Sequence, residues 1–187
     1  MERVIGLETE YGLLGRSARG RLGSSEAAQL LFAPLEREYR SSNVFLAAGG
    51  RLYLDVGSHP EYATPECATV VDAVVAGRAG DELMLDLADR AVAAAAQAGT
   101  SVRLRLFKNN TDSYGNSYGS HENYLVERAS DPDRFAEALT GFLVTRQLTS
   151  GNGSLSRGEF RISQRADHLH EAFYATTDKW DELIRVF

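Results

Sequence analysis

Residues 51 to 64, RLYLDVGSHPEYAT, gather many side chains that can ionise, bind a phosphate or hold a metal. The first six residues read as a strand, in which alternate side chains share one face. Arg51, Tyr53 and Asp55 would project from one face, and the apolar residues between them would pack on a core. A cation, a phenol and a carboxylate in a row predict a polar site on this strand.

Further carboxylates lie near this strand along the chain. The turn signal VGSHP would bring Glu61 back toward the polar face, and Glu8 and Glu10 repeat the two-residue spacing in LETEYG. Clustered carboxylates without a nearby thiol are typical of a hard cation such as Mg²⁺, whose coordination nucleotide phosphates often complete. Arginine suits a phosphate, and a spare carboxylate, Asp55, suits a general base. The alternative is the solvated face of an ordinary strand.

The histidines and the cysteine give weaker evidence for a site. His59 and His121 are more typical of hydrogen-bonded structural histidines than of zinc ligands, and HLHE at 168 to 171 reads as a helix surface. Neither a Walker-type phosphate loop nor a serine-elbow motif occurs in the sequence. Cys67 lacks an obvious partner base and reads as a small packing residue.

Composition narrows the class of protein. The 187 residues, 43% of them hydrophobic and 25% charged, are typical of a globular domain with a core. A net charge of -6 argues against nucleic-acid binding, which needs a basic surface. A single cysteine, no apolar leader and no membrane-length apolar run favour a cytoplasmic protein without a membrane partner.

The order of expected elements favours an α+β fold with a mostly antiparallel sheet. We expect a strand at 3 to 8, a helix at 24 to 39 with a serine cap and a break or kink at Pro34, and a hairpin formed by NVFL and RLYLDV. Helical sequence follows Pro65 and stops at Gly99.

The second half continues this mixture of strands and helices. SVRLRLF at 101 to 107 should be a strand paired with ENYLVE at 122 to 127, across a long polar loop. Asp131 and Pro132 should start a helix, SGNGS should be a turn or loop, and EFRIS a final strand.

Five blocks of sequence, in order, resemble the N-terminal part of the Pup ligase and Pup deamidase family, which is related to glutamine synthetase and to carboxylate–amine ligases. They are IGLETEYG (5 to 12), SSNVFL to GGRLYLDVGSHPEYATPEC (41 to 67), LFKNNTDSYGNSYGSHENYL (106 to 125), FLVTRQL (142 to 148) and ISQRAD (162 to 167). The stretch DVGSHPEY favours the ligases within this family, because the deamidases have a shorter, altered link between the aspartate and HPEY. The deamidases also have a long insertion ahead of their RLY strand, for which the roughly forty residues before Arg51 leave no room.

The resemblance implies a role for each matching residue. Arg51 and Thr64 would contact ATP, and Asp55 would be the catalytic base; the Mg²⁺ ligands would be Glu8, Tyr53 and Glu61. The implied fold is a curved, mostly antiparallel, glutamine-synthetase-like sheet that cradles ATP, with helices on its outer face. Residues 1 to 187 would be the N-terminal part of one catalytic domain, so that the sheet would be incomplete.

The implied reaction is ATP-dependent. ATP would phosphorylate the C-terminal glutamate of Pup, a small ubiquitin-like modifier, and a lysine of a protein substrate would then form an isopeptide bond that marks the protein for proteasomal degradation. The alternatives are a Pup deamidase or depupylase, a truncated non-catalytic relative that binds nucleotide or Pup, and, more remotely, a ligase of small molecules. The NTRDEPH block of the family is missing from these residues, so the chain could be a fragment of a longer gene product, or a second polypeptide could supply the remainder.

Overall fold

A computed structural model describes residues 4–55, 57–112, 115–116, 118–125, 132–156 and 158–164. The chain divides into two units. The first contains residues 1–109 and 118–124, and the second contains residues 110–117 and 125–187. The expectation of one catalytic domain over residues 1 to 187 stays a prediction. Among the described residues, no helix is long and apolar enough to cross a membrane.

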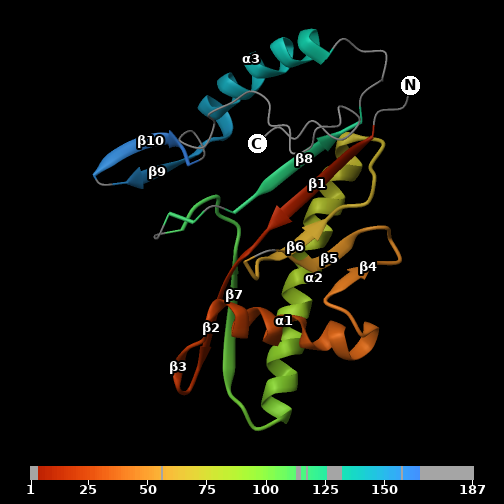
Figure 1. Cartoon of the computed structure of the whole chain (residues 1–187), viewed down its shortest axis with the longest axis vertical. Coiled ribbons are helices and arrows are strands. Elements are labelled where there is room, and N and C mark those ends of the chain that lie inside the picture. Colours follow the sequence, from red (N-terminus) through yellow and green to blue (C-terminus); the bar gives the residue numbers. More distant parts are fainter. Residues whose placement is uncertain are drawn as a thin grey trace. The chain divides into compact units, whose positions relative to one another are not determined.

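A five-stranded sheet in the first unit carries the residues that the sequence singles out (Figure 1). Its strand order is β4-β5-β6-β1-β8, and every neighbouring pair is antiparallel. The bounds are β4 Asn43–Phe45, β5 Arg51–Leu54, β6 Pro60–Ala63, β1 Ile5–Glu10 and β8 Ser120–Tyr124. The predicted hairpin of NVFL and RLYLDV is confirmed, since β4 pairs with β5.

A second sheet in this unit contains β3 (Gly20–Arg21), β2 (Gly12–Ser17) and β7 (Val102–Phe107) in that order. The sequence did not predict β2, and the predicted pairing of 101–107 with 122–127 is wrong. Instead, β7 pairs with β2 while β8 pairs with β1. The long connection after β7 lets the two strands pair with successive halves of the N-terminal segment, which local sequence patterns could not indicate.

Two helices belong to the first unit. The helix α1 (Ser24–Tyr39) contains Pro34 and continues through it, so of the predicted break or kink the break does not occur. Its N-cap residue is Gly23 rather than a serine, and no side chain caps it. The helix α2 (Val70–Gln97) starts later than the expected position after Pro65, because Thr69 accepts a hydrogen bond from the Asp72 backbone and caps it. It ends just before Gly99, whose φ of 77° suits the expected stop.

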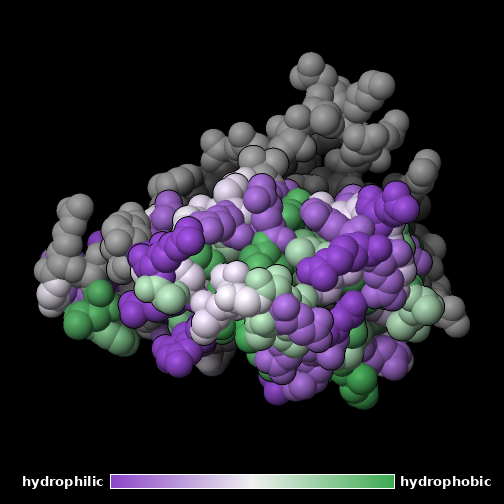
Figure 2. Space-filling view, turned by 90° about the horizontal axis from the view of Figure 1, so that it is seen from below, coloured by the Kyte–Doolittle hydropathy of each residue, from purple (hydrophilic) through white to green (hydrophobic). Residues whose placement is uncertain are grey.

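The core of the first unit lies on one face of the five-stranded sheet. Leu52 and Tyr62, cross-strand partners on β5 and β6, are buried in one cluster with residues of α1 and α2. The helix residues in this cluster are Leu31, Phe32, Leu35, Met84, Leu87 and Ala88. The opposite face of the sheet therefore carries the alternate residues of the same strands. Seen from below, the surface is largely hydrophilic, with scattered apolar residues (Figure 2).

The second unit contains α3 (Pro132–Ser150) and a hairpin of β9 (Asn152–Ser156) with β10 (Glu159–Ser163). The expected helix and the strand EFRIS are confirmed. The expected turn or loop at SGNGS is wrong except at Gly151, because α3 ends at Ser150 and β9 begins at Asn152. The predicted helix surface at 168 to 171 and the predicted capping Asp131 lie outside the described residues. The fold class is α+β with antiparallel sheets, as the sequence predicted.

Candidate active site on the five-stranded sheet

Cross-strand pairing brings distant polar residues onto the sheet face that lies opposite the core. Arg51 pairs with Ala63, Ala63 with Glu8, and Glu8 with His121. Because directly paired residues in a sheet share a face, these side chains form one row across four strands. A second row runs from Tyr53 through Glu61 to Glu10 on β1. The predicted polar face of residues 51 to 55 is therefore part of a larger polar surface on this sheet.

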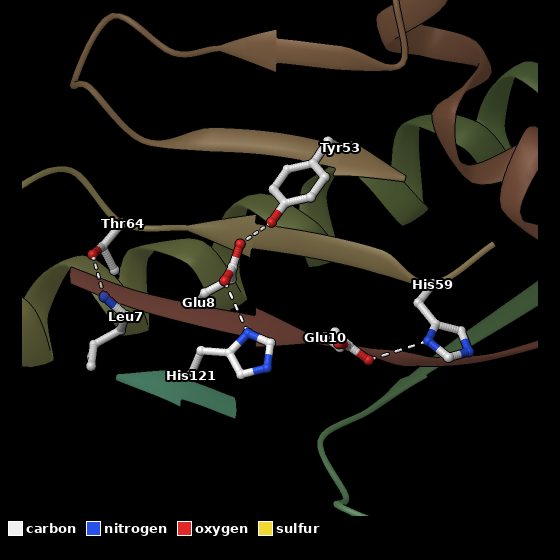
Figure 3. Close-up of polar contacts among 7 residues, drawn as sticks. All are labelled: Leu7, Glu8, Glu10, Tyr53, His59, Thr64 and His121. Carbon is white, nitrogen blue, oxygen red and sulfur yellow. Dashed lines mark hydrogen bonds and ion pairs between the residues drawn. The ribbon is translucent and has the colours of Figure 1, made fainter. Parts of the chain in front are cut away.

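Glu8 lies at the centre of a hydrogen-bonded group (Figure 3). The Tyr53 hydroxyl donates to one of its carboxylate oxygens, and His121 Nδ1 lies 2.9 Å from the other. The hydrogen bond with His121 holds the pKa of Glu8 well below its usual value, at about 2. The same hydrogen bond raises the pKa of His121. Glu8 is therefore a fixed anion at neutral pH.

Glu61 has the opposite electrostatic character. It is a buried carboxyl, 2% exposed, and burial together with the negative charge of Glu8 raises its pKa to about 8. A carboxyl that is kept from ionising by a neighbouring anion gains most from a bound cation, which would offset both charges. The pKa of Tyr53 is also raised, by burial and by its hydrogen bond to Glu8, so the phenol keeps its proton.

Two overlapping groups of side chains on this face have the spacing of metal ligands. Ligand atoms of Glu8, Glu61 and His121 lie within 4.8 Å of one another, and so do those of Glu10, Asp55 and Glu61. Carboxylate oxygens suit Mg²⁺ or Mn²⁺, and one imidazole is compatible with such a set. The donor set therefore fits the expected Mg²⁺.

Asp55 lies at the open edge of the site, just beyond the end of β5. Its side chain is exposed, and its backbone N–H donates to the His59 carbonyl across a tight turn. The turn uses Gly57 and Ser58, with φ values of 91° and 67°, to return the chain to β6 and Glu61. An exposed carboxylate beside the site is accessible to a substrate amine, as a general base requires.

Arg51 is held by its neighbours on β4 and β5. Its Nε donates to Asn43 Oδ1 at 2.8 Å, and its guanidinium carbon lies 4.1 Å from the centre of the Tyr53 ring. The position and plane of the cation are thus restrained before any ligand arrives, which favours phosphate binding.

Thr64, unlike the other predicted residues, lies neither in these rows nor in a group with the spacing of metal ligands. Its backbone N–H donates to the Leu7 carbonyl, and its hydroxyl oxygen accepts a hydrogen bond from the Leu7 N–H at 2.9 Å (Figure 3). The Thr64 hydroxyl therefore extends the pairing of β1 and β6. The hydroxyl proton of Thr64 remains for a hydrogen bond to a ligand oxygen.

The structure adds two histidines, His59 and His121, that the sequence did not place in the site. His59 Nδ1 lies 3.2 Å from a carboxylate oxygen of Glu10. The His59 ring packs on the Tyr118 ring, with 4.8 Å between the ring centres. The expectation that His59 and His121 are hydrogen-bonded is confirmed, yet both bond to site carboxylates. The sequence placed His121 at the end of the long polar loop, and its pairing with Glu8 depends on a strand register that the sequence does not reveal.

The fold and this face define a protein with a carboxylate-lined site on an antiparallel sheet, suited to a divalent cation with a phosphate ligand. The family model described as "Pup-ligase protein" matches residues 3–184, so the chain belongs to that family. The chain is 50% identical over 184 residues to the Pup–protein ligase of Corynebacterium diphtheriae, covering 97% of this chain and 38% of that protein. It is 49% identical over 188 residues to the Pup–protein ligase of Paenarthrobacter aurescens, covering 98% and 41%.

Solved structures of the family agree with the fold. A complex of the prokaryotic ubiquitin-like protein Pup with its ligase PafA matches with a TM-score of 0.83 and 42% identity, covering 90% of this chain and 35% of that one. PafA in complex with ADP matches with a TM-score of 0.64 and 42% identity, covering 84% and 36%. The chain therefore spans about two-fifths of the length of its relatives or less.

Proposed function

We propose that this chain provides the nucleotide- and metal-binding part of a Pup–protein ligase. The observation that carries the proposal is the pair of polar rows on the five-stranded sheet, in which Glu8, Glu61 and His121 have the spacing of metal ligands. Membership of the Pup-ligase family and the likeness to a PafA complex with ADP support a nucleotide as the ligand.

Glu8 and Glu61 would hold Mg²⁺, with the Tyr53 hydroxyl as the third predicted ligand and His121 beside them. A bound Mg²⁺ supplies charge neutralisation for the phosphates of ATP. Because the Tyr53 hydroxyl keeps its proton and donates a hydrogen bond to Glu8, its main contribution from this geometry is to orient that carboxylate. Arg51, restrained by Asn43, would bind phosphate oxygens, and Thr64 would donate its hydroxyl proton.

The chemistry would proceed in two steps. The terminal phosphoryl group of ATP passes to the carboxylate of the C-terminal glutamate of Pup, releasing ADP and forming an acyl phosphate. A substrate lysine amine then attacks the acyl carbon, phosphate leaves, and an isopeptide bond forms. Asp55 would take the proton that the amine must lose, for which its exposed position beside Glu61 is suitable. The product would mark proteins for proteasomal degradation in the cytoplasm.

A second polypeptide is part of this proposal as one source of the remaining part of the ligase. The relatives contain more than twice the matched length, so further contacts to ATP and Pup would come from the part of a ligase that these 187 residues do not match. A non-catalytic protein that binds nucleotide or Pup is the second candidate. A Pup deamidase or depupylase would use the same face to cleave the amide.

The test is a conjugation assay with Pup, a lysine-bearing protein, ATP and Mg²⁺, read by the mass of the conjugate. The chain is assayed alone and together with the C-terminal remainder of the C. diphtheriae relative as a separate polypeptide. Conjugates that form in either mixture and disappear with Asp55→Asn support the ligase. Nucleotide binding without conjugates in both mixtures favours the binding protein, and release of Pup from preformed conjugates favours the depupylase.

A further inference from the structure

We infer that Phe45 is the platform on which the base of the bound nucleotide stacks, an inference that rests on the proposed function and extends it to base recognition. Phe45 is the last residue of the edge strand β4, and the residue is 73% exposed. An exposed phenylalanine contributes little to the hydrophobic core. Its position relative to the two polar rows therefore decides whether it can contact a ligand.

The sheet register places Phe45 at one end of the central row of the site. Phe45 pairs with Arg51, Arg51 with Ala63, Ala63 with Glu8, and Glu8 with His121. Paired residues share a face, so the row reads aromatic, cation, methyl, carboxylate, imidazole across all five strands. Its two ends therefore suit two different parts of one ligand.

The dimensions of this row suit an extended nucleotide. Neighbouring strands lie about 4.8 Å apart, so Phe45 and Glu8 are about 14 Å apart across three strand spacings. The residue between Arg51 and Glu8 is Ala63, whose short side chain leaves room for a ligand to lie on the sheet. A cation and phosphates held at Glu8 would thus leave the aromatic end of the ligand near Phe45.

In this row, Arg51 lies between the aromatic Phe45 and the anionic Glu8. Its guanidinium carbon lies 5.4 Å from the centre of the Phe45 ring and 4.1 Å from that of Tyr53, and its Nε is bound to Asn43. The two outer nitrogens of Arg51 make no hydrogen bond with the residues that the structure describes. They remain available for phosphate oxygens, while Phe45 and the planar cation together offer flat surfaces on which a base can stack.

The experiment compares two probes that differ only in whether they contain a base. Binding of Mg²⁺ with ADP and of Mg²⁺ with inorganic tripolyphosphate is measured by calorimetry on the whole chain. Phe45→Ala should weaken ADP binding by about tenfold or more and leave tripolyphosphate binding within about twofold. Phe160→Ala is the matched control, because Phe160 on β10 is 74% exposed and lies in the other unit. It should change neither.

A second variant gives a direct signal of stacking. Phe45→Trp keeps a flat ring at the same position, so ADP should still bind and should quench the fluorescence of the new indole, whereas tripolyphosphate should not. Unchanged ADP affinity in Phe45→Ala would overturn the inference and leave the proposed function standing. Equal loss of both probes would also overturn it, since Phe45 would then support the site rather than the base. Failure of the unmodified chain to bind either probe would overturn both.

Discussion

Replacement of Glu61 by glutamine should stabilise the metal-free chain at alkaline pH while removing its response to metal. Glu61 is 2% exposed, and burial beside Glu8 raises its pKa from 4.5 to about 8. The folded chain therefore retains a proton on Glu61 at pH values where the unfolded chain has released it. Stability from this group is complete below about pH 4.5 and is lost as the pH rises through about 8.

The size of this loss follows from the shift in the pKa of Glu61. One pKa unit corresponds to about 1.4 kcal/mol, so between pH 5 and 8 the group costs the folded chain on the order of 3 kcal/mol. The pKa of Glu8, lowered to about 2 by its hydrogen bond with His121, leaves that carboxylate ionised over the whole range. The raised pKa of His121 adds a loss of stability in the same direction, which the Glu61 variant retains.

The assay is urea unfolding followed by circular dichroism, with chelator present, at pH 5 and pH 8. The free energy of unfolding of Glu61→Gln should fall less between these pH values than that of the unmodified chain, by on the order of 3 kcal/mol. Glu66→Gln makes the same change at an exposed position and should leave the pH dependence unaltered. Added Mg²⁺ should stabilise the unmodified chain and not Glu61→Gln. Equal pH dependence in all three proteins would refute the assigned electrostatics.

Two further predictions concern Asp55 and Gly80. Asp55→Asn should lower the rate of conjugation at least about 100-fold, since a general base contributes about that much. The affinity for Mg²⁺–ADP should be unchanged, because the Mg²⁺ ligands of the proposed site are Glu8, Tyr53 and Glu61; normal conjugation would remove Asp55 from the mechanism. Gly80→Ala would place a Cβ 2.1 Å from Tyr62 Cδ1 and should destabilise the chain by about 1–3 kcal/mol in urea unfolding. Gly77→Ala, on the same helix with its nearest neighbour at 3.6 Å, is the control and should stabilise the chain by up to about 1 kcal/mol.

The residues of the polar strand could be predicted because their pattern is local. Alternation along β5 places Arg51 and Tyr53 on the site face and Leu52 in the core, and the register of β5 with β6 brings Glu61 opposite Tyr53. The turn signal before Glu61 was enough to predict its return. Tyr53 and Glu61, the two predicted metal ligands that come from one hairpin, could therefore be predicted from the sequence.

The remaining features depend on pairing between distant segments. His121 reaches Glu8 only because β8 pairs with β1, and the sequence suggested β7 as its partner instead. Alternating apolar residues show that a segment is a strand but not which strand lies beside it. For the same reason, the alignment of Phe45 with Arg51, Ala63 and Glu8 could be found only in the folded sheet.

The central claim is that one face of the five-stranded sheet binds a nucleotide with its cation. The most direct test is calorimetric titration of the whole chain with ATP and Mg²⁺ at pH 7.5, with Glu61→Gln as the control, since that variant should be at least as stably folded without metal. We expect saturable binding that is lost in Glu61→Gln. Absence of binding to the folded, unmodified chain, or equal binding to both proteins, would contradict the claim.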